Sequence, residues 1–225
     1  EAQDFGLFII ADGMGGHKNG ETASCVAVEA IVRYLMDHLY NEKFDSIQAS
    51  SITDIKESLL NAVNEAQKAV QQYAPGGGTT LALALVLSEA VTICHVGDTR
   101  VYFILPDGAL QRLTTDHSLV QRLVDLHEIT EAEAEVHPQR NVLLRAIGQP
   151  EPFVPDIQTL QFPKGGRLMI CSDGLWGVIG EKALRELTRL KLTPMASCQK
   201  LVDAAIQAGG PDNISVILVQ QTKAQ

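Results

Sequence analysis

The sequence predicts an α+β fold, an α-β-β-α sandwich in which two antiparallel sheets pack face to face and a helix pair covers each outer face. Helical patterns stand near both ends of the chain and enclose a run of short β-type segments, an order typical of α+β proteins. Tight turns join these segments, and Pro106-Asp107-Gly108 is the strongest turn signal. Strands joined by tight turns are antiparallel. Helix pairs over both sheets would bury all the apolar faces.

Four segments have the apolar spacing of amphipathic helices. They are residues 21–39, 53–73, 181–190 and 194–208. The second is the clearest, because Leu59, Val63 and Val70 fall on one face of a helix. Thr53-Asp54 can cap its start, and the glycines after Pro75 end it.

Short runs of β-branched, aromatic and other apolar residues predict strands. They are residues 5–12, 79–87, 91–96, 101–105, 110–113, 157–160, 168–172 and 214–219. Residues 114–148 return to a charged, helix-forming composition and predict a small helical flap over a sheet edge. The sequence shows no internal repeat and no linker, so we interpret residues 1–225 as a single domain.

The charge balance limits the classes of partner. Lys and Arg number 18 against 27 Asp and Glu, a net charge of -9. An acidic surface repels nucleic acid and anionic membranes, so we expect neither as a partner. It would also repel phosphorylated substrates unless bound cations inverted the local field.

The cysteines indicate a reducing compartment. Cys25, Cys94, Cys171 and Cys198 form no Cys-x-x-Cys pair, and three of them lie inside apolar patterns. We therefore predict buried free thiols and a cytoplasmic location. No apolar run approaches the roughly 20 residues of a membrane-spanning helix, and the start of the chain has no signal-peptide pattern.

The most informative stretch is the apolar run from Phe5 that ends in Asp12-Gly13-Met14-Gly15-Gly16-His17. A carboxylate at the end of a buried strand is costly unless it is paired. The next basic residue is Lys18, so a metal cation is the natural partner for Asp12. The glycines let the backbone turn sharply and bring carbonyl oxygens close to an ion.

The same pattern recurs along the chain. The apolar run 167–172 ends in Asp173-Gly174, and Asp212-Asn213 precedes the apolar run 214–219. A weaker copy is Gly97-Asp98-Thr99-Arg100. Acids at the ends of strands far apart in sequence can converge if the strands lie side by side. Oxygen ligands without clustered Cys or His favour Mg²⁺ or Mn²⁺ over zinc.

The order of these motifs resembles one family. The motifs are 11–17 (Ala-Asp-Gly-Met-Gly-Gly-His), 78–80 (Gly-Thr-Thr), 96–100 (Val-Gly-Asp-Thr-Arg), 116–118 (Asp-His-Ser), 171–175 (Cys-Ser-Asp-Gly-Leu) and 210–213 (Gly-Pro-Asp-Asn). The series resembles the bacterial branch of the PPM, or type-2C, metal-dependent serine/threonine protein phosphatases. The resemblance runs from Phe5 to Val219 and implies the same α-β-β-α sandwich.

The resemblance implies a reaction and a ligand set. Two ions about 3.5–4 Å apart hold a bridging water that attacks the phosphorus of phosphoserine or phosphothreonine. Asp12 would bridge the two ions, and the Gly13 carbonyl would complete one coordination sphere. Asp173 and Asp212 would hold the first ion. Asp98, with Asp173, would hold a third and weaker one.

The alternative for each acid is a purely structural role. Asp12, Asp173 and Asp212 would then cap helices or turns. For Asp98 the competing interpretation is an ion pair with Arg100, two residues further along.

Histidine is the usual proton donor near neutral pH, and a leaving alkoxide needs a proton. His17, after the glycine turn, and His117, in the flap, are the candidates for catalytic residues; each could equally be a solvated or helix-capping histidine. His95 alternates with apolar neighbours and is interpreted as a sheet histidine, and Trp176 as a core anchor. Thr79 and Thr80 are expected to start a strand and to supply a supporting hydroxyl. Asn213 is expected to orient Asp212.

One part of the family pattern is not found. The family begins with a strand that carries a phosphate-binding Arg, followed by a segment with a further acidic ligand, and nothing before Phe5 matches either. Since Phe5 starts abruptly as a strand interior, we expect a segment that precedes the given sequence. Without it, the second metal and the phosphate would bind poorly.

The leading hypothesis is a phosphoprotein phosphatase that uses two or three Mg²⁺ or Mn²⁺ ions and acts as a monomer. By analogy with bacterial members, its partners would be phosphorylated proteins and a cognate serine/threonine kinase. The alternatives are a catalytically weak regulatory or binding module on the same fold, and a phosphatase of anti-sigma-factor antagonists in stress or sporulation control. The acidic charge disfavours a metal-dependent nuclease.

Overall fold

The structure is a computed structural model, and it describes residues 5–14, 17–40, 52–150 and 153–221. The chain divides into two compact units, which are described separately below. The first unit is Glu1–Gly97 with Leu144–Leu160, and the second is Asp98–Leu143 with Gln161–Gln225.

The first unit is a four-stranded sheet covered by two helices. The sheet has the order β1-β4-β5-β8, with strands β1 (Phe5–Ile10), β4 (Leu81–Leu87), β5 (Ala90–Val96) and β8 (Asp156–Gln161). Strand β4 pairs antiparallel with β1 and with β5. A short antiparallel ribbon pairs β2 (Gly13–Met14) with β3 (Gly78–Thr79). In the sequence, β2 follows β1 and β3 precedes β4.

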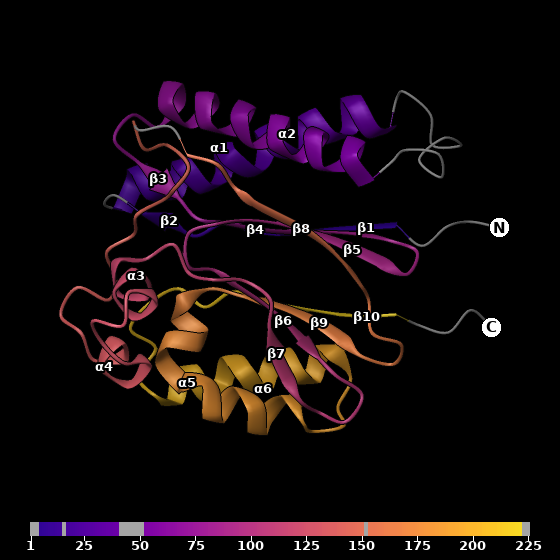
Figure 1. Cartoon of the computed structure of the whole chain (residues 1–225), viewed down its shortest axis with the longest axis vertical. Helices are drawn as coiled ribbons and strands as arrows, with labels where there is room; N and C mark the ends of the chain where they lie inside the picture. The colour runs from indigo at the N-terminus through magenta and orange to yellow at the C-terminus, as the bar shows by residue number, and fades with distance from the viewer. Residues whose placement is uncertain (1–4, 15–16, 41–51, 151–152, 222–225) are drawn as a thin grey trace. The chain divides into compact units, whose positions relative to one another are not determined.

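Two long helices bury the apolar face of this sheet. They are α1 (His17–Leu35), which continues as a π-helix over Met36–Tyr40, and α2 (Ile52–Tyr73). Figure 1 shows them side by side over the sheet. Ile31, Leu59 and Leu83 are fully buried between helices and sheet, in a single apolar cluster.

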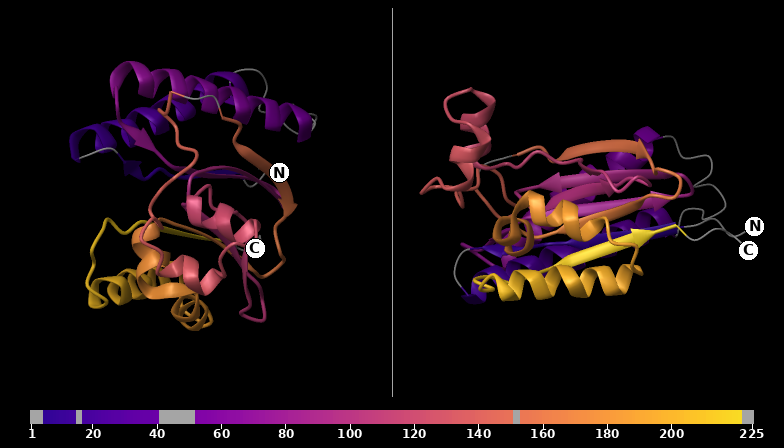
Figure 2. Two further views of the ribbon diagram at one scale, coloured as in Figure 1. Left: turned by 60° about the vertical axis from the view of Figure 1, so that its left-hand side comes forward. Right: turned by 90° about the horizontal axis from the view of Figure 1, so that it is seen from below.

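The second unit is likewise a four-stranded sheet covered by two helices. Its sheet has the order β10-β9-β6-β7, and all its pairs are antiparallel. The strands are β6 (Arg100–Ile104), β7 (Leu110–Arg112), β9 (Arg167–Cys171) and β10 (Val216–Gln220). Helices α5 (Asp173–Thr188) and α6 (Pro194–Gln207) cover it, and α6 runs along β10 (Figure 2).

Residues 114–148, the predicted flap, contain two short helices within the second unit, α3 (Leu119–Asp125) and α4 (Glu131–Glu135). Ser118 caps α3 by accepting from the Gln121 amide, and Thr130 with Glu133 forms a capping box on α4. The hydrogen bonds of Thr130 lower the pKa of Glu133.

The predicted α+β class is confirmed, since each unit pairs one antiparallel sheet with two helices. Two helix boundaries were wrong. Helix α1 begins at His17 rather than Glu21, and α5 begins at Asp173 rather than Glu181. The additional residues, 17–20 in α1 and 173–180 in α5, include glycines, which have a low helix propensity. Tertiary packing overrides this low propensity in both places. Gly180 has a φ of 73° and marks a kink inside α5, so the predicted helix is only its second segment.

The turn prediction at Pro106-Asp107-Gly108 is confirmed. It closes the β6–β7 hairpin, with Gly108 at a φ of 84°. The Ala109 amide donates to the Asp107 carboxylate at 2.9 Å, which stabilises the turn locally.

All four cysteines are free, but only part of the burial prediction is confirmed. Cys94 and Cys171 are buried, Cys198 is partly buried and Cys25 is exposed on α1. Cys25 was misjudged because its apolar neighbours face the sheet while its own position does not. Burial raises the pKa of both Cys94 and Cys171 to about 12.

Iodoacetamide at pH 8 should therefore alkylate Cys25 rapidly and spare Cys94 and Cys171. A thiol with a pKa near 12 is only about one ten-thousandth thiolate at that pH, and the thiolate is the reactive form. Mass spectrometry of peptides from the native protein checks this order, and labelling in urea should modify all four residues. Equal native labelling of Cys25 and Cys171 would contradict the packing around β9.

Candidate active site

Asp12 follows β1, and its main chain is held by Thr79, the last residue of β3, and by Thr80, which precedes β4. The Asp12 amide donates to Thr80 Oγ1 at 3.0 Å. Its carbonyl accepts from Thr79 Oγ1 at 3.0 Å and from the Thr80 amide at 2.8 Å. Both threonines are buried. The predicted supporting hydroxyls are found, and they support the main chain of Asp12. The predicted strand start is less exact, because Thr79 ends β3 and Thr80 directly precedes β4.

The glycine turn after Asp12 packs tightly against the first turn of α1. A Cβ on Gly13 would lie 2.1 Å from the Gly20 carbonyl oxygen, so no larger residue fits. This close approach explains why Gly20 is tolerated inside a helix. Gly15 and Gly16 lie outside the described residues, as does the side chain of His17, whose backbone begins α1.

In the second unit, three predicted ligands come from one edge of the sheet. The central strand β9 ends at Cys171, which is paired with Arg100 on β6 and with Val216 on β10. Because both pairings are antiparallel, the end of β9 coincides with the starts of its two neighbours. Asp173 follows that end, and Asp98 and Asp212 precede those starts.

Hydrogen bonds join the Asp173 and Asp212 segments. Ser172 Oγ accepts from the Ser215 amide at 3.1 Å and donates to the Asn213 carbonyl at 3.3 Å. A Cβ on Gly174 would lie 2.1 Å from that same carbonyl oxygen, so the first turn of α5 packs directly against the loop. The main-chain N–H of Asn213 donates to Asp212 Oδ1 at 2.7 Å. This bond does not depend on the Asn213 side chain, so the expectation that Asn213 orients Asp212 stays a prediction.

A buried charged network fixes the Asp98 segment. Arg100 forms a bidentate ion pair with Asp116, with its shortest contact, Nη2 to Oδ2, at 2.7 Å. Its guanidinium carbon lies 3.4 Å from the centroid of the Trp176 ring. The indole Nε1–H of Trp176 donates to the Asp98 carbonyl at 3.0 Å. Trp176 is thus more than a core anchor, because it links α5 to the segment of Asp98.

The network keeps Arg100 positively charged. Burial alone would lower the pKa of Arg100, but hydrogen bonds and the charge of Asp116 raise it above its ordinary value. Burial also raises the pKa of Tyr102, whose hydroxyl accepts from Arg100 at 3.4 Å. Asp116 is an ion-pair partner of Arg100 that sequence reasoning missed. The only signal was its place in the Asp-His-Ser motif.

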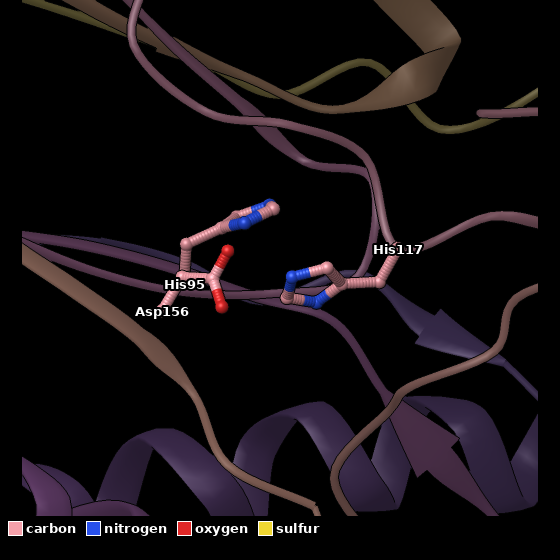
Figure 3. Close-up of side chains that lie close together, drawn as sticks. All are labelled: His95, His117 and Asp156. Atoms are coloured by element: carbon pink, nitrogen blue, oxygen red, sulfur yellow. The ribbon is translucent and has the colours of Figure 1, made fainter. Parts of the chain in front are cut away.

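The histidines differ in their surroundings. His117 is buried and stands between Asp116, which is held by Arg100, and Ser118, which caps α3. His95 is buried in β5, as predicted for a sheet histidine. Figure 3 shows it beside Asp156 of the neighbouring strand, where a ring nitrogen and a carboxylate oxygen lie within 4.8 Å. Asp156 also pairs with Arg145 at 3.2 Å.

The donor set fits a divalent cation that prefers oxygen. In the second unit, three acidic residues lie at or near one end of the sheet, and carboxylate oxygens are ligands that such a cation prefers. Asp173 stands at the first position of α5, where the helix dipole favours a negative charge. Within either unit, no three His, Cys, Asp or Glu side chains of the described residues have ligand atoms all within 4.8 Å.

Replacing Trp176 with Phe should lower the free energy of unfolding by about 1 kcal/mol, the usual contribution of one hydrogen bond. Phe keeps an aromatic ring beneath Arg100 but cannot donate to the Asp98 carbonyl. Urea unfolding followed by circular dichroism measures the change. Trp176→Leu, which also removes the cation–π contact, should cost more. A Phe variant as stable as the parent would show that the Asp98 bond contributes nothing.

Comparison with known proteins identifies the family. The family model described as Protein phosphatase 2C matches residues 1–208. The serine/threonine phosphatase stp of Listeria monocytogenes is 35% identical over 225 residues, covering 97% of this chain and 86% of its own length.

Solved structures agree. The S. agalactiae serine/threonine phosphatase has a TM-score of 0.83 at 31% identity, covering 95% of this chain and 86% of that one. The catalytic domain of the phosphatase PstP, in complex with 2 manganese ions, has a TM-score of 0.75 at 29% identity and covers 94% of this chain and 86% of its own. The chain thus belongs to the protein phosphatase 2C family, as a metal-dependent serine/threonine protein phosphatase of the bacterial type.

Proposed function

We propose that this phosphatase holds two or three Mg²⁺ or Mn²⁺ ions through Asp12, the Gly13 carbonyl, Asp98, Asp173 and Asp212. The observation that carries the proposal is the alignment of Arg100, Cys171 and Val216 across three strands, because it brings three of the acids to one edge. The family resemblance assigns Asp12 as the ligand shared between ions. PstP, a similar phosphatase, has been solved with 2 manganese ions.

The first unit supports the role of Asp12 through its main chain. Thr79 and Thr80 hold the amide and the carbonyl of Asp12, which limits the directions open to its carboxylate. Ligands fixed in this way lose little conformational entropy when an ion binds. The same logic applies to Asp98, whose carbonyl is held by Trp176.

Bound cations would supply charge neutralisation at the phosphoryl oxygens and a water of lowered pKa as the nucleophile. The residues of the chain would orient the ions and protonate the leaving group. We propose that His17 or His117 donates the proton that the leaving serine or threonine oxygen needs. The Arg100–Asp116 pair and the Ser118 cap hold the main chain on both sides of His117.

The substrates are phosphorylated proteins, and the proposal extends to a cognate serine/threonine kinase, a monomeric state and a cytoplasmic location. The net charge of -9 would repel phosphopeptides, so cations at the site would also draw the substrate in. The free cysteines suit a reducing compartment. In the part of the chain that the structure describes, no helix is both long enough and apolar enough to cross a membrane.

The direct test is hydrolysis of a phosphothreonine peptide by the metal-free protein, with Mn²⁺ or Mg²⁺ added back. Turnover should depend on the added ion and stop with EDTA, because the proposed nucleophile is a water whose pKa only a bound cation lowers. Released phosphate is the measurement. Turnover that survives exhaustive chelation would contradict the proposed centre.

Asp12→Asn and Asp173→Asn should each lower kcat/KM more than about a hundredfold, because losing a ligand should cost more than the roughly 10–100-fold loss typical of residues behind the ligands. The matched control is Asp107→Asn, which alters an Asp-Gly pair in a hairpin turn outside the proposed site. That control should keep the parent's activity. A folded Asp12→Asn variant with full activity would remove Asp12 from the ligand set.

A further inference from the structure

Gln67 lies on α2, outside the motifs of the family, yet its side chain holds a segment some eighty residues further along the chain. Its Nε2–H donates to the Gln149 carbonyl at 2.6 Å. Its Oε1 accepts from the Gly148 amide, also at 2.6 Å. The side-chain amide of Gln67 therefore uses both of its ends, its oxygen on the Gly148 N–H and its nitrogen on the Gln149 carbonyl. Gln71, one turn along α2, adds a longer bond of 3.0 Å to the same Gln149 carbonyl.

The segment that Gln67 holds is a tight turn pressed against α2. Gly148 has a φ of 98°, and a Cβ there would lie 2.6 Å from both the Gly77 oxygen and a methyl group of Val70. The Ala146 amide donates to the Gln149 side chain at 3.2 Å, which closes the turn. The turn cannot move closer to α2, and the two hydrogen bonds of Gln67 keep it from moving away. Gln67 therefore fixes the position of the turn on α2.

The turn is joined to the strand that holds Asp12. Ile147 and Thr79 exchange two main-chain hydrogen bonds, each of 2.9 Å, and both residues are fully buried. The hydroxyl of Thr79 then donates to the Asp12 carbonyl at 3.0 Å. An unbroken path of contacts thus runs through the first unit from Gln67 to the turn, to Thr79 and to Asp12.

We propose that Gln67 is a positioning residue for metal binding at Asp12. By fixing the turn 146–149, it fixes the placement of Thr79 and thereby the main chain that aims the Asp12 carboxylate. The inference rests on the proposed role of Asp12 as a ligand.

The test is a calorimetric titration of the metal-free protein with Mn²⁺, without substrate. Gln67→Leu should raise the dissociation constant for Mn²⁺ about tenfold, the lower end of the range for residues behind the ligands. At saturating Mn²⁺, kcat should return to near the parent value, since no group that touches the substrate has changed. A purely structural role would lower the thermal midpoint and leave the dissociation constant of the folded protein unchanged, and that result would overturn the proposal.

Two further variants locate the effect. Gln71→Leu is the matched control, because it removes one bond to the same carbonyl and leaves both bonds of Gln67 in place; it should bind Mn²⁺ like the parent. Thr79→Val should weaken binding, since it removes the hydroxyl that holds Asp12. If Thr79→Val weakens binding and Gln67→Leu does not, the path stops at Thr79 and the proposal is wrong.

The same titration separates the two proposals. If Asp12→Asn binds Mn²⁺ like the parent, Asp12 is not a ligand and both proposals fail. If Asp12→Asn loses binding while Gln67→Leu keeps it, only the role of Gln67 fails. Should Gln67→Leu not fold, Gln67→Glu takes its place, because it retains the acceptor for the Gly148 amide and loses the donor. It should also raise the dissociation constant, because an oxygen takes the place of the donor and faces the Gln149 carbonyl, and a parent-like value would overturn the proposal.

Discussion

An antiparallel strand ends where its neighbours begin, and this property of sheets places the acidic residues of the second unit. Asp173 follows the end of β9, while Asp98 and Asp212 precede the starts of the two strands that flank it. No long-range charge attraction is needed to collect these acids, which would repel one another. The pairing of β9 with its neighbours supplies the free energy, through a ladder of backbone bonds and a buried apolar face.

Neutral donors hold the acids by their main chains in both units. Thr79 and Thr80 hold Asp12, and the indole of Trp176 holds Asp98. Charge is used elsewhere, in the Arg100–Asp116 pair, whose side chains are only 11% and 5% exposed. Losing one member of such a pair typically costs about 3–5 kcal/mol, because the other charge stays buried without its counter-ion. The pair therefore specifies one arrangement of the segment that leads into α3.

Sequence reasoning reached the class of the fold, the strands and the motif order, because apolar periodicity and Asp-Gly turns are local signals. It missed the first segment of α5, where Gly174 and Gly177 argue against a helix. The reason for Gly174 is the Asn213 carbonyl against which it packs, and that contact is not visible from neighbouring residues. Asp116 and Gln67 were missed for the same reason, since their partners lie 16 and about 81 positions away.

Trp176 is the only tryptophan in the chain. Its ring lies beneath a guanidinium, and its nitrogen is bonded to the carbonyl of Asp98. The emission of an indole depends on nearby charge and on the hydrogen bond of its N–H, so all tryptophan fluorescence of the protein originates beside the acid-bearing end of the sheet. The chain thus contains a native optical probe at this end, and any ion or phosphorylated ligand that displaces Asp98 would be visible without a label.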